Sequence, residues 1–110
     1  MSSEAIGSFE LMVLLAVLRS GEDAYGVTIA AAMEESSGHH VLVGSVYAAL
    51  DRLERRGLLV SRLGQPTAER GGRAKRFFRL TAKGLRDVRQ LRGTLLRLWR
   101  GLPAFEGLRE

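Results

Sequence analysis

Apolar residues dominate the first third of the chain and predict two helices. Residues 9–19 are apolar on almost every side, so we expect a helix there that is capped by Ser8, buried on several sides and also in contact with a partner subunit. A second helix is expected over residues 25–36, where the apolar positions form a one-sided stripe and Asp23 is suited to cap the first turn.

The middle of the chain changes from helical to alternating periodicity. After a short extended segment at residues 39–43, apolar residues return at spacings of three and four and predict a third helix over residues 46–56, opened by Gly44 and Ser45. Alternation of apolar and polar residues then predicts strands at residues 58–63 and 74–80. A polar loop joins the two strands, so we expect a hairpin.

The last predicted helix, residues 82–100, has Thr81 as its expected cap and carries a seam of apolar residues. Their spacing alternates between three and four, as it does when two helices pack along their length. We therefore expect a homodimer. The residues expected at its interface are Phe9, Met12, Val88, Leu91, Leu95, Leu98, Trp99 and Leu102.

The order of these elements predicts a mainly α fold with a small β hairpin: a winged helix-turn-helix followed by a long C-terminal dimerisation helix. We assign residues 1–80 to the winged helix-turn-helix DNA-binding domain, and residues 81–110 to the dimerisation helix and a short tail. The third helix is the one expected to enter the major groove, whose width admits an α-helix.

Charge supports a nucleic-acid partner. The formal net charge is +5 and the pI is about 10.7, an excess that favours polyanions. The predicted hairpin concentrates this charge, because Glu69 is the single acid among five basic residues between positions 69 and 79. A solvated surface is the alternative interpretation, but cations on a thin protrusion suit a minor groove or the phosphates beside it.

Four stretches of the chain resemble the PadR family of transcriptional regulators. They are Asp23–Gly26, Gly44–Leu58, Gly71–Leu80 and Thr81–Gly84, within a similarity that spans roughly residues 8–84. The resemblance implies a bacterial or archaeal dimeric repressor, and the short C-terminus is similar to the subfamily with a single dimerisation helix. It also implies DNA contacts at Tyr47, Arg73, Lys75 and Arg76, whereas the family tyrosine of the second wing strand is Phe77 or Phe78 here and has lost its hydroxyl.

Other DNA contacts are expected around the third helix. Ser45 lies at its N-terminus, where side chains and free backbone N–H groups can meet phosphates, and Arg52 is placed to reach a base edge or a phosphate. The full expected set of DNA-binding residues is Tyr25, Ser45, Tyr47, Arg52, Arg70, Arg73, Lys75 and Arg76.

Trp99 has two interpretations. The first is packing at the dimer interface, where aromatic residues dominate burial. The second follows from the family resemblance and is a small aromatic ligand held between the two C-terminal helices, in a pocket formed by Phe9, Met12, Leu95 and Trp99. The tryptophan lies about a turn from the family position, so this pocket is expected to be shaped differently or closed.

Several classes of protein are disfavoured. The chain has no cysteine, and the neighbouring His39 and His40 point to opposite faces of an extended chain, so no metal or cofactor is expected. No catalytic constellation is visible, which argues against an enzyme. The apolar run Leu11–Leu18 is too short to span a bilayer and no signal peptide is apparent, so we expect a cytoplasmic protein that does not bind membranes.

The function expected from the sequence is sequence-specific binding of duplex DNA by a transcriptional regulator. A homodimeric repressor would recognise a palindromic operator and would be released by a small molecule bound near the dimer interface. The alternative is a winged-helix module for protein–protein interaction, or for non-specific DNA binding without ligand sensing.

Overall fold

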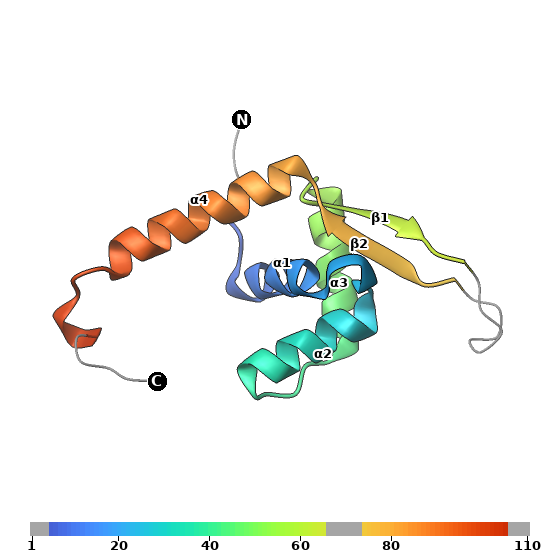
Figure 1. Ribbon diagram of the computed structural model, residues 1–110, viewed down its shortest axis with the longest axis horizontal. Helices are drawn as coiled ribbons and strands as arrows, with labels where there is room; N and C mark the ends of the chain where they lie inside the picture. The colour runs from blue at the N-terminus through green and yellow to red at the C-terminus, as the bar shows by residue number, and fades with distance from the viewer. Residues whose placement is uncertain (1–4, 66–73, 106–110) are drawn as a thin grey trace.

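The computed structural model describes residues 5–65 and 74–105. Its helices and strands are α1 (Ser8–Ser20), η1 (Gly21–Asp23), α2 (Gly26–Ser37), α3 (Val43–Arg55), β1 (Leu59–Leu63), β2 (Arg76–Leu80), α4 (Ala82–Trp99) and η3 (Pro103–Phe105). Figure 1 shows that α1, α2 and α3 form one body, from which the hairpin of β1 and β2 projects on one side and α4 on the other. The fold class predicted from the sequence is confirmed.

Two helices begin differently from the prediction. Gly7, not Ser8, precedes α1, and its N–H donates to the Glu10 carboxylate (3.3 Å). Likewise Tyr25, not Asp23, precedes α2 and donates its N–H to Thr28 Oγ1 (3.0 Å). In both helices the side chain three residues into the helix reaches back to the preceding N–H, so the N-cap residue needs no polar side chain.

Helix α3 begins three residues before the predicted start at position 46. Leu42 is its N-cap, because the N–H groups of Ser45 and Val46 both donate to the Leu42 carbonyl (3.0 and 3.2 Å). The expected extended segment at residues 39–43 therefore forms no strand within the described part of the chain, whose sheet contains β1 and β2 only. The turn that leads into α3 is held by Glu34, which accepts the Val41 N–H at 2.8 Å.

The core lies between the three N-terminal helices and the hairpin. Helix α1 packs against α2, α3 and β2, in agreement with the prediction that it is buried on several sides. Its outer side chains nevertheless remain exposed at Met12, Leu15 and Leu18. The largest fully buried side chains are Val13, Leu14, Ile29, Val46, Leu50, Leu53, Leu58 and Leu59.

Helix α4 is fixed to the turn between α3 and β1. Thr81 caps the helix as predicted, since its Oγ1 accepts the Gly84 N–H (3.0 Å) and donates to the Gly57 carbonyl (2.6 Å). Gly84 packs directly on the backbone of Leu58, where a Cβ atom would overlap the carbonyl oxygen. The direction in which α4 leaves the body is therefore set by its first turn. No helix in the described ranges is both long enough and apolar enough to cross a membrane.

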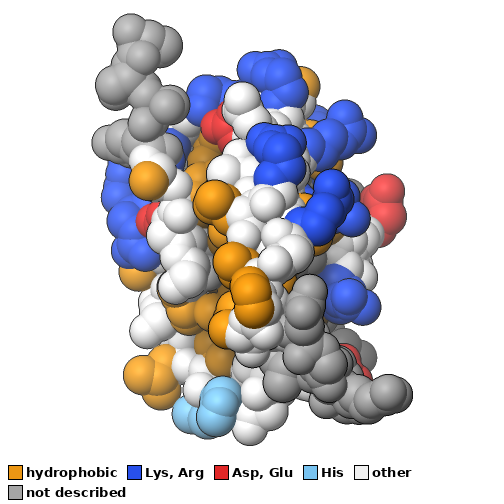
Figure 2. All heavy atoms as spheres, turned by 90° about the vertical axis from the view of Figure 1, so that its left-hand side faces the viewer, with side chains coloured by type: hydrophobic (Ala, Val, Ile, Leu, Met, Phe, Trp, Pro, Cys, Tyr) orange, Lys and Arg blue, Asp and Glu red, His pale blue; other side chains and the backbone are white. Residues whose placement is uncertain are grey.

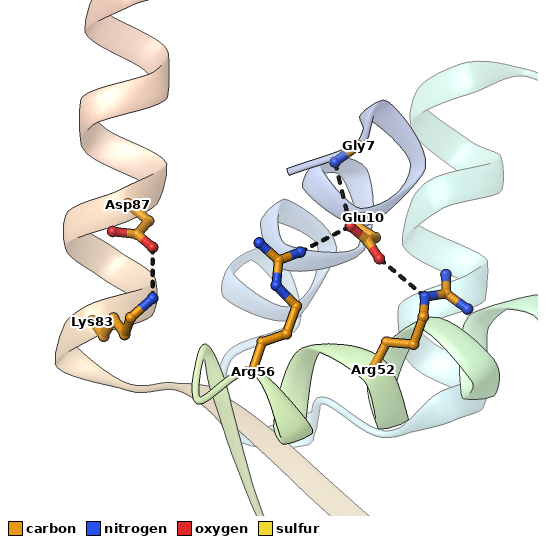
Figure 3. A network of polar contacts seen from close by, with 6 residues as sticks. All are labelled: Gly7, Glu10, Arg52, Arg56, Lys83 and Asp87. Atoms are coloured by element: carbon orange, nitrogen blue, oxygen red, sulfur yellow. Dashed lines mark hydrogen bonds and ion pairs between the residues drawn. The ribbon is translucent and has the colours of Figure 1, made fainter. Parts of the chain in front are cut away.

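An ion-pair network joins α1 to α3 (Figure 3). The Glu10 carboxylate accepts hydrogen bonds from Arg52 Nε (3.0 Å) and Arg56 Nη1 (3.2 Å). The hydrogen bond from Arg52 lowers the pKa of Glu10, with help from the Gly7 N–H and the two guanidinium charges, while partial burial opposes the shift. The network fixes α3 along the side of α1.

The contact between α4 and the α3–β1 turn predicts a large effect for Gly84→Ala. The added Cβ forces the backbone of α4 and Leu58 apart, so we expect urea unfolding to show a loss of roughly 1–3 kcal/mol. Gly93→Ala in the same helix is the matched control, since its Cβ meets only the mobile end of Arg97 at 3.3 Å and alanine favours helix. Equal stability of the two variants would contradict the contact.

The Glu10 network predicts a pH-dependent loss of stability. Because the folded-state pKa lies below the unfolded value near 4.5, the contribution of Glu10 is complete above that value and is lost as pH falls through the folded-state pKa. Glu10→Gln should lower the free energy of unfolding at neutral pH by up to about 1 kcal/mol. It should also flatten the acid limb of stability measured by urea unfolding between about pH 3 and pH 7.

The matched control for this prediction is Glu22→Gln, since Glu22 is exposed in η1 and outside the network. Its curve should keep the wild-type shape. A Glu10→Gln curve parallel to the wild type would contradict the role of this carboxylate.

Candidate nucleic-acid interface

Helix α3 has one buried face and one open face. Its apolar residues Val46, Ala49, Leu50 and Leu53 are buried in the core. The exposed residues on its other sides are Val43, Gly44, Ser45, Tyr47, Ala48, Asp51, Arg52 and Arg55. The open face includes three residues predicted to bind DNA, namely Ser45, Tyr47 and Arg52.

Tyr47 lies across the start of α2. A Cβ atom on Gly26 would overlap both the ring and the hydroxyl of Tyr47, so the glycine makes room for the phenol. The Tyr47 side chain nevertheless stays exposed. The Tyr47 ring therefore lies on the backbone directly after Tyr25, another predicted contact residue, which precedes Gly26 in the chain.

Cations and aromatic rings alternate toward the loop end of the hairpin strands. The Lys75 ammonium lies 4.5 Å from the ring centroid of Tyr25, and Tyr25 meets the ring of Phe77 edge to face at 5.6 Å. On the same strand pair, the Arg62 guanidinium lies 4.8 Å from the centroid of Phe77. These contacts hold Lys75 and Arg62 at the surface by cation–π attraction. We call the four residues the hairpin stack.

The two phenylalanines of β2 face opposite ways. Phe78 is buried in the core, so Phe77 is the aromatic residue on the outer face. The alternation of β2 was expected from the sequence, but Arg62 was not among the predicted site residues. Its pairing with Phe77 depends on the register of the two strands, and the sequence does not reveal that register because many residues separate the strands.

Arg76 joins the hairpin to α3. Its guanidinium donates to Glu54 Oε1 (2.9 Å) and to Ser61 Oγ (3.0 Å), and Ser61 Oγ donates to Glu54 Oε2 (2.7 Å). Arg52 likewise donates a hydrogen bond to a carboxylate, that of Glu10 in α1. Both arginines were predicted to bind DNA, and both form intramolecular ion pairs in this structure. Arg70 and Arg73 lie outside the described residues.

The residues predicted for the dimer interface differ in exposure. Val88 belongs to the core of the chain itself, and Phe9 and Leu91 are half-buried. Leu98 and Trp99 are 67% and 58% exposed, and Leu95, Leu102 and Met12 are exposed as well. Figure 2 views the molecule from the side toward which α4 extends in Figure 1. It shows apolar side chains gathered along the middle of this face, with lysines and arginines around them. The exposed part of the seam is therefore the second half of α4 and the residues that follow it.

The residues predicted for a ligand pocket lie on two elements. Phe9 and Met12 belong to α1, and Met12 lines a groove of about 270 Å³ between α1 and α2. Leu95 and Trp99 belong to the part of α4 that extends away from the body, where the Trp99 ring lies 5.6 Å from the ring of Phe105.

The two neighbouring histidines, for which no metal site was predicted, lie between α2 and α3. His40 Nδ1 lies 2.8 Å from Glu34 Oε2 at the end of α2. Within residues 5–65 and 74–105, no three His, Asp or Glu side chains lie together as metal ligands would. The exposed His40–Glu34 pair thus forms part of the turn before α3.

The fold is similar to several solved structures of regulators. A PadR family transcriptional regulator from Eggerthella lenta DSM 2243 is 22% identical, with 94% of this chain and 85% of that chain covered and a TM-score of 0.69. A PadR-like regulator from Bacillus cereus strain ATCC 14579 is also 22% identical, over 86% of this chain and 93% of that one, with a TM-score of 0.60. Bacillus subtilis PadR in complex with operator DNA is 20% identical, over 96% and 55%, with a TM-score of 0.66.

Identities this low establish the fold alone, and no curated protein matches the chain. Family membership rests on the sequence itself. The model of the Transcriptional regulator PadR-like family matches residues 14–90, which is more than half of the chain and includes α2, α3, the hairpin and the first half of α4. The chain therefore belongs to the PadR-like family of transcriptional regulators.

Proposed function

We propose that this chain binds duplex DNA sequence-specifically and represses transcription as a homodimer on a palindromic operator. The observation that carries the proposal is the continuous surface from α3 to the hairpin. Tyr47 lies on Gly26, and the ring of the preceding Tyr25 contacts the Lys75 ammonium. The Tyr25 ring also meets that of Phe77, which contacts the Arg62 guanidinium. The Bacillus subtilis PadR structure with operator DNA has the same fold, which supports DNA as the occupant of this surface.

The two parts of the surface have different tasks. The first residues of a recognition helix are those that reach base edges in the major groove, which gives this task to α3 through Ser45 and Tyr47. Lys75 and Arg62 of the hairpin stack would bind phosphates, which sets position and orientation without reading sequence. Because the aromatic rings already hold these cations, little side-chain freedom is lost on binding.

Arg52 and Arg76 take a different role in this proposal. A phosphate that binds either guanidinium has to compete with Glu10 or Glu54, at 3.0 and 2.9 Å. We infer that the two arginines act chiefly as positioning residues, which hold α3 against α1 and the hairpin against α3. Pairing also neutralises two carboxylates that would otherwise repel DNA.

A second copy of the chain is the proposed partner of the apolar seam on α4. Leu98 and Trp99 are large, neighbouring and mostly exposed, and contiguous apolar surface of this kind marks an interaction site. A twofold dimer presents two α3 helices about one turn of DNA apart, which matches a palindrome. Release by a small aromatic ligand near Trp99 stays a prediction, and the proposed place of action is the cytoplasm.

Selection from a random duplex library tests the function. The purified protein should enrich an inverted repeat whose half-sites are centred about one helical turn apart, and fluorescence anisotropy should show at least about 1,000-fold tighter binding to it than to random duplex. Equal affinity for both would favour non-specific DNA binding, and no binding at all would favour a protein–protein interaction module.

The hairpin stack predicts the salt dependence of binding to the selected duplex. Lys75→Ala should weaken binding to all sequences alike and reduce the slope of log K against log salt by about 0.9, the value for one lost phosphate contact. Lys83→Ala is the matched control, because Lys83 pairs with Asp87 on α4 (3.1 Å) away from the proposed surface. An unchanged slope in Lys75→Ala would show that this lysine touches no phosphate.

The exposed seam predicts the oligomeric state. Leu98→Glu places a charge in the proposed interface, so sedimentation should show monomers and operator affinity should fall because only one half-site is bound at a time. Gln90→Glu changes an exposed residue of α4 outside the seam and should leave the dimer intact. A Leu98→Glu protein that still sediments as a dimer would place the interface elsewhere.

A further inference from the structure

The first turn of α3 is built from residues that the fold itself does not favour. Leu42 occupies the N-cap without a side-chain hydrogen bond, although leucine is among the poorest residues at this position. Val43 follows it as the first helical residue. The two side chains are 64% and 40% exposed, whereas the aliphatic residues Val46, Leu50 and Leu53 further along α3 are buried. The core does not require either of them.

Gly44 is the third such residue. Glycine disfavours helix, and it is usually retained for a left-handed backbone or for lack of space. Neither reason applies here, because Gly44 is not among the residues of positive φ and a Cβ atom built on it would meet nothing within 4 Å. Residues that go against the preferences of a helix start without stabilising the fold point to a functional constraint. The close approach of another molecule to this turn would be such a constraint.

We propose that Leu42 and Val43 contact the C5-methyl groups of thymines in the major groove, and that Gly44 lets the backbone of α3 approach the base edges. The proposal rests on the DNA-binding function above and names what the helix reads. The thymine methyl is the apolar group that the major groove presents. Exposed apolar side chains at the start of a recognition helix are matched to it in both chemistry and position.

The same contact would discriminate against other bases. Cytosine offers an amino donor and no methyl at the corresponding edge, and burying that donor against leucine leaves it without a hydrogen-bond partner. Reading by Leu42 and Val43 is therefore independent of charge, unlike the phosphate contacts of Lys75 and Arg62. The operator is expected to carry thymines opposite the first turn of α3 in each half-site.

Deoxyuridine substitution tests the proposal, since it removes the methyl and changes nothing else on the base. In the selected duplex, thymines are replaced one at a time and affinity is measured with the wild-type protein. We expect one or two positions per half-site at which each lost methyl weakens binding about fourfold, equivalent to about 0.8 kcal/mol. The slope of log K against log salt should stay unchanged.

Protein variants then identify which side chain contacts a given thymine methyl. In Leu42→Ala, the thymine and uracil duplexes should bind with equal affinity at the position that Leu42 reads, while Leu63→Ala should keep the fourfold difference. Leu63 is the matched control, because it is a leucine exposed to 70% at the end of β1. Gly44→Ala should leave unfolding midpoints unchanged or higher and weaken operator binding at least tenfold.

The outcomes separate this proposal from the DNA-binding function. Specific binding that is indifferent to every uracil substitution overturns the methyl contact and leaves the proposed function intact. Methyl dependence that persists in both Leu42→Ala and Val43→Ala assigns the reading to other residues and also overturns it. If no duplex is bound more tightly than random sequence, both proposals fail, and if no DNA is bound at all, the exposed residues would belong to a protein interface.

Discussion

Helix α3 must be held firmly on one face while the other stays open, and the rest of the structure depends on this constraint. Its apolar face fills the core, which holds the helix by close packing. Carboxylates add contacts on two further sides, with Glu10 of α1 on Arg52 and Arg56, and Glu54 on Arg76 of β2. The ion pairs are individually weak where exposed. Their value lies in fixing the angle between α3, α1 and the hairpin.

The elements of the fold followed from periodicity, but the start of α3 did not. The stripe from Val46 to Leu53 predicted the helix, and Ser45 looked like its polar start. In the structure, the turn held by Glu34 and Val41 delivers the chain to the helix at Leu42. Capping preferences could not indicate this, because leucine is used there against its local tendency. The proposed methyl contact explains why leucine stands at this position.

The site was only partly predictable, because its geometry depends on contacts between distant positions. Tyr47 and Lys75 were expected from the family resemblance, and Tyr25 was also among the predicted DNA-binding residues. In the structure Lys75 lies over the Tyr25 ring, and Tyr47 lies on the neighbouring Gly26. Arg52 and Arg76 carry the expected charge, yet their partners are 42 and 22 residues away in sequence, and no local pattern reveals an ion pair at that separation. The heptad spacing likewise could not show that Val88 serves the core of its own chain while Leu98 is left exposed.

In the proposed dimer, the attachment of α4 would couple the dimer interface mechanically to α3. Thr81 and Gly84 clamp the first turn of α4 onto Gly57 and Leu58, directly after the end of α3. The clamp has little room to deform, since Gly84 already touches backbone. A change in the angle between two α4 helices would therefore move each α3 as part of a rigid body, and the spacing of the two helices would change. Apolar contacts with base methyls are short-ranged, so they would be lost first, while phosphate attraction persisted over about a Debye length. Specific binding would then fall before non-specific binding does.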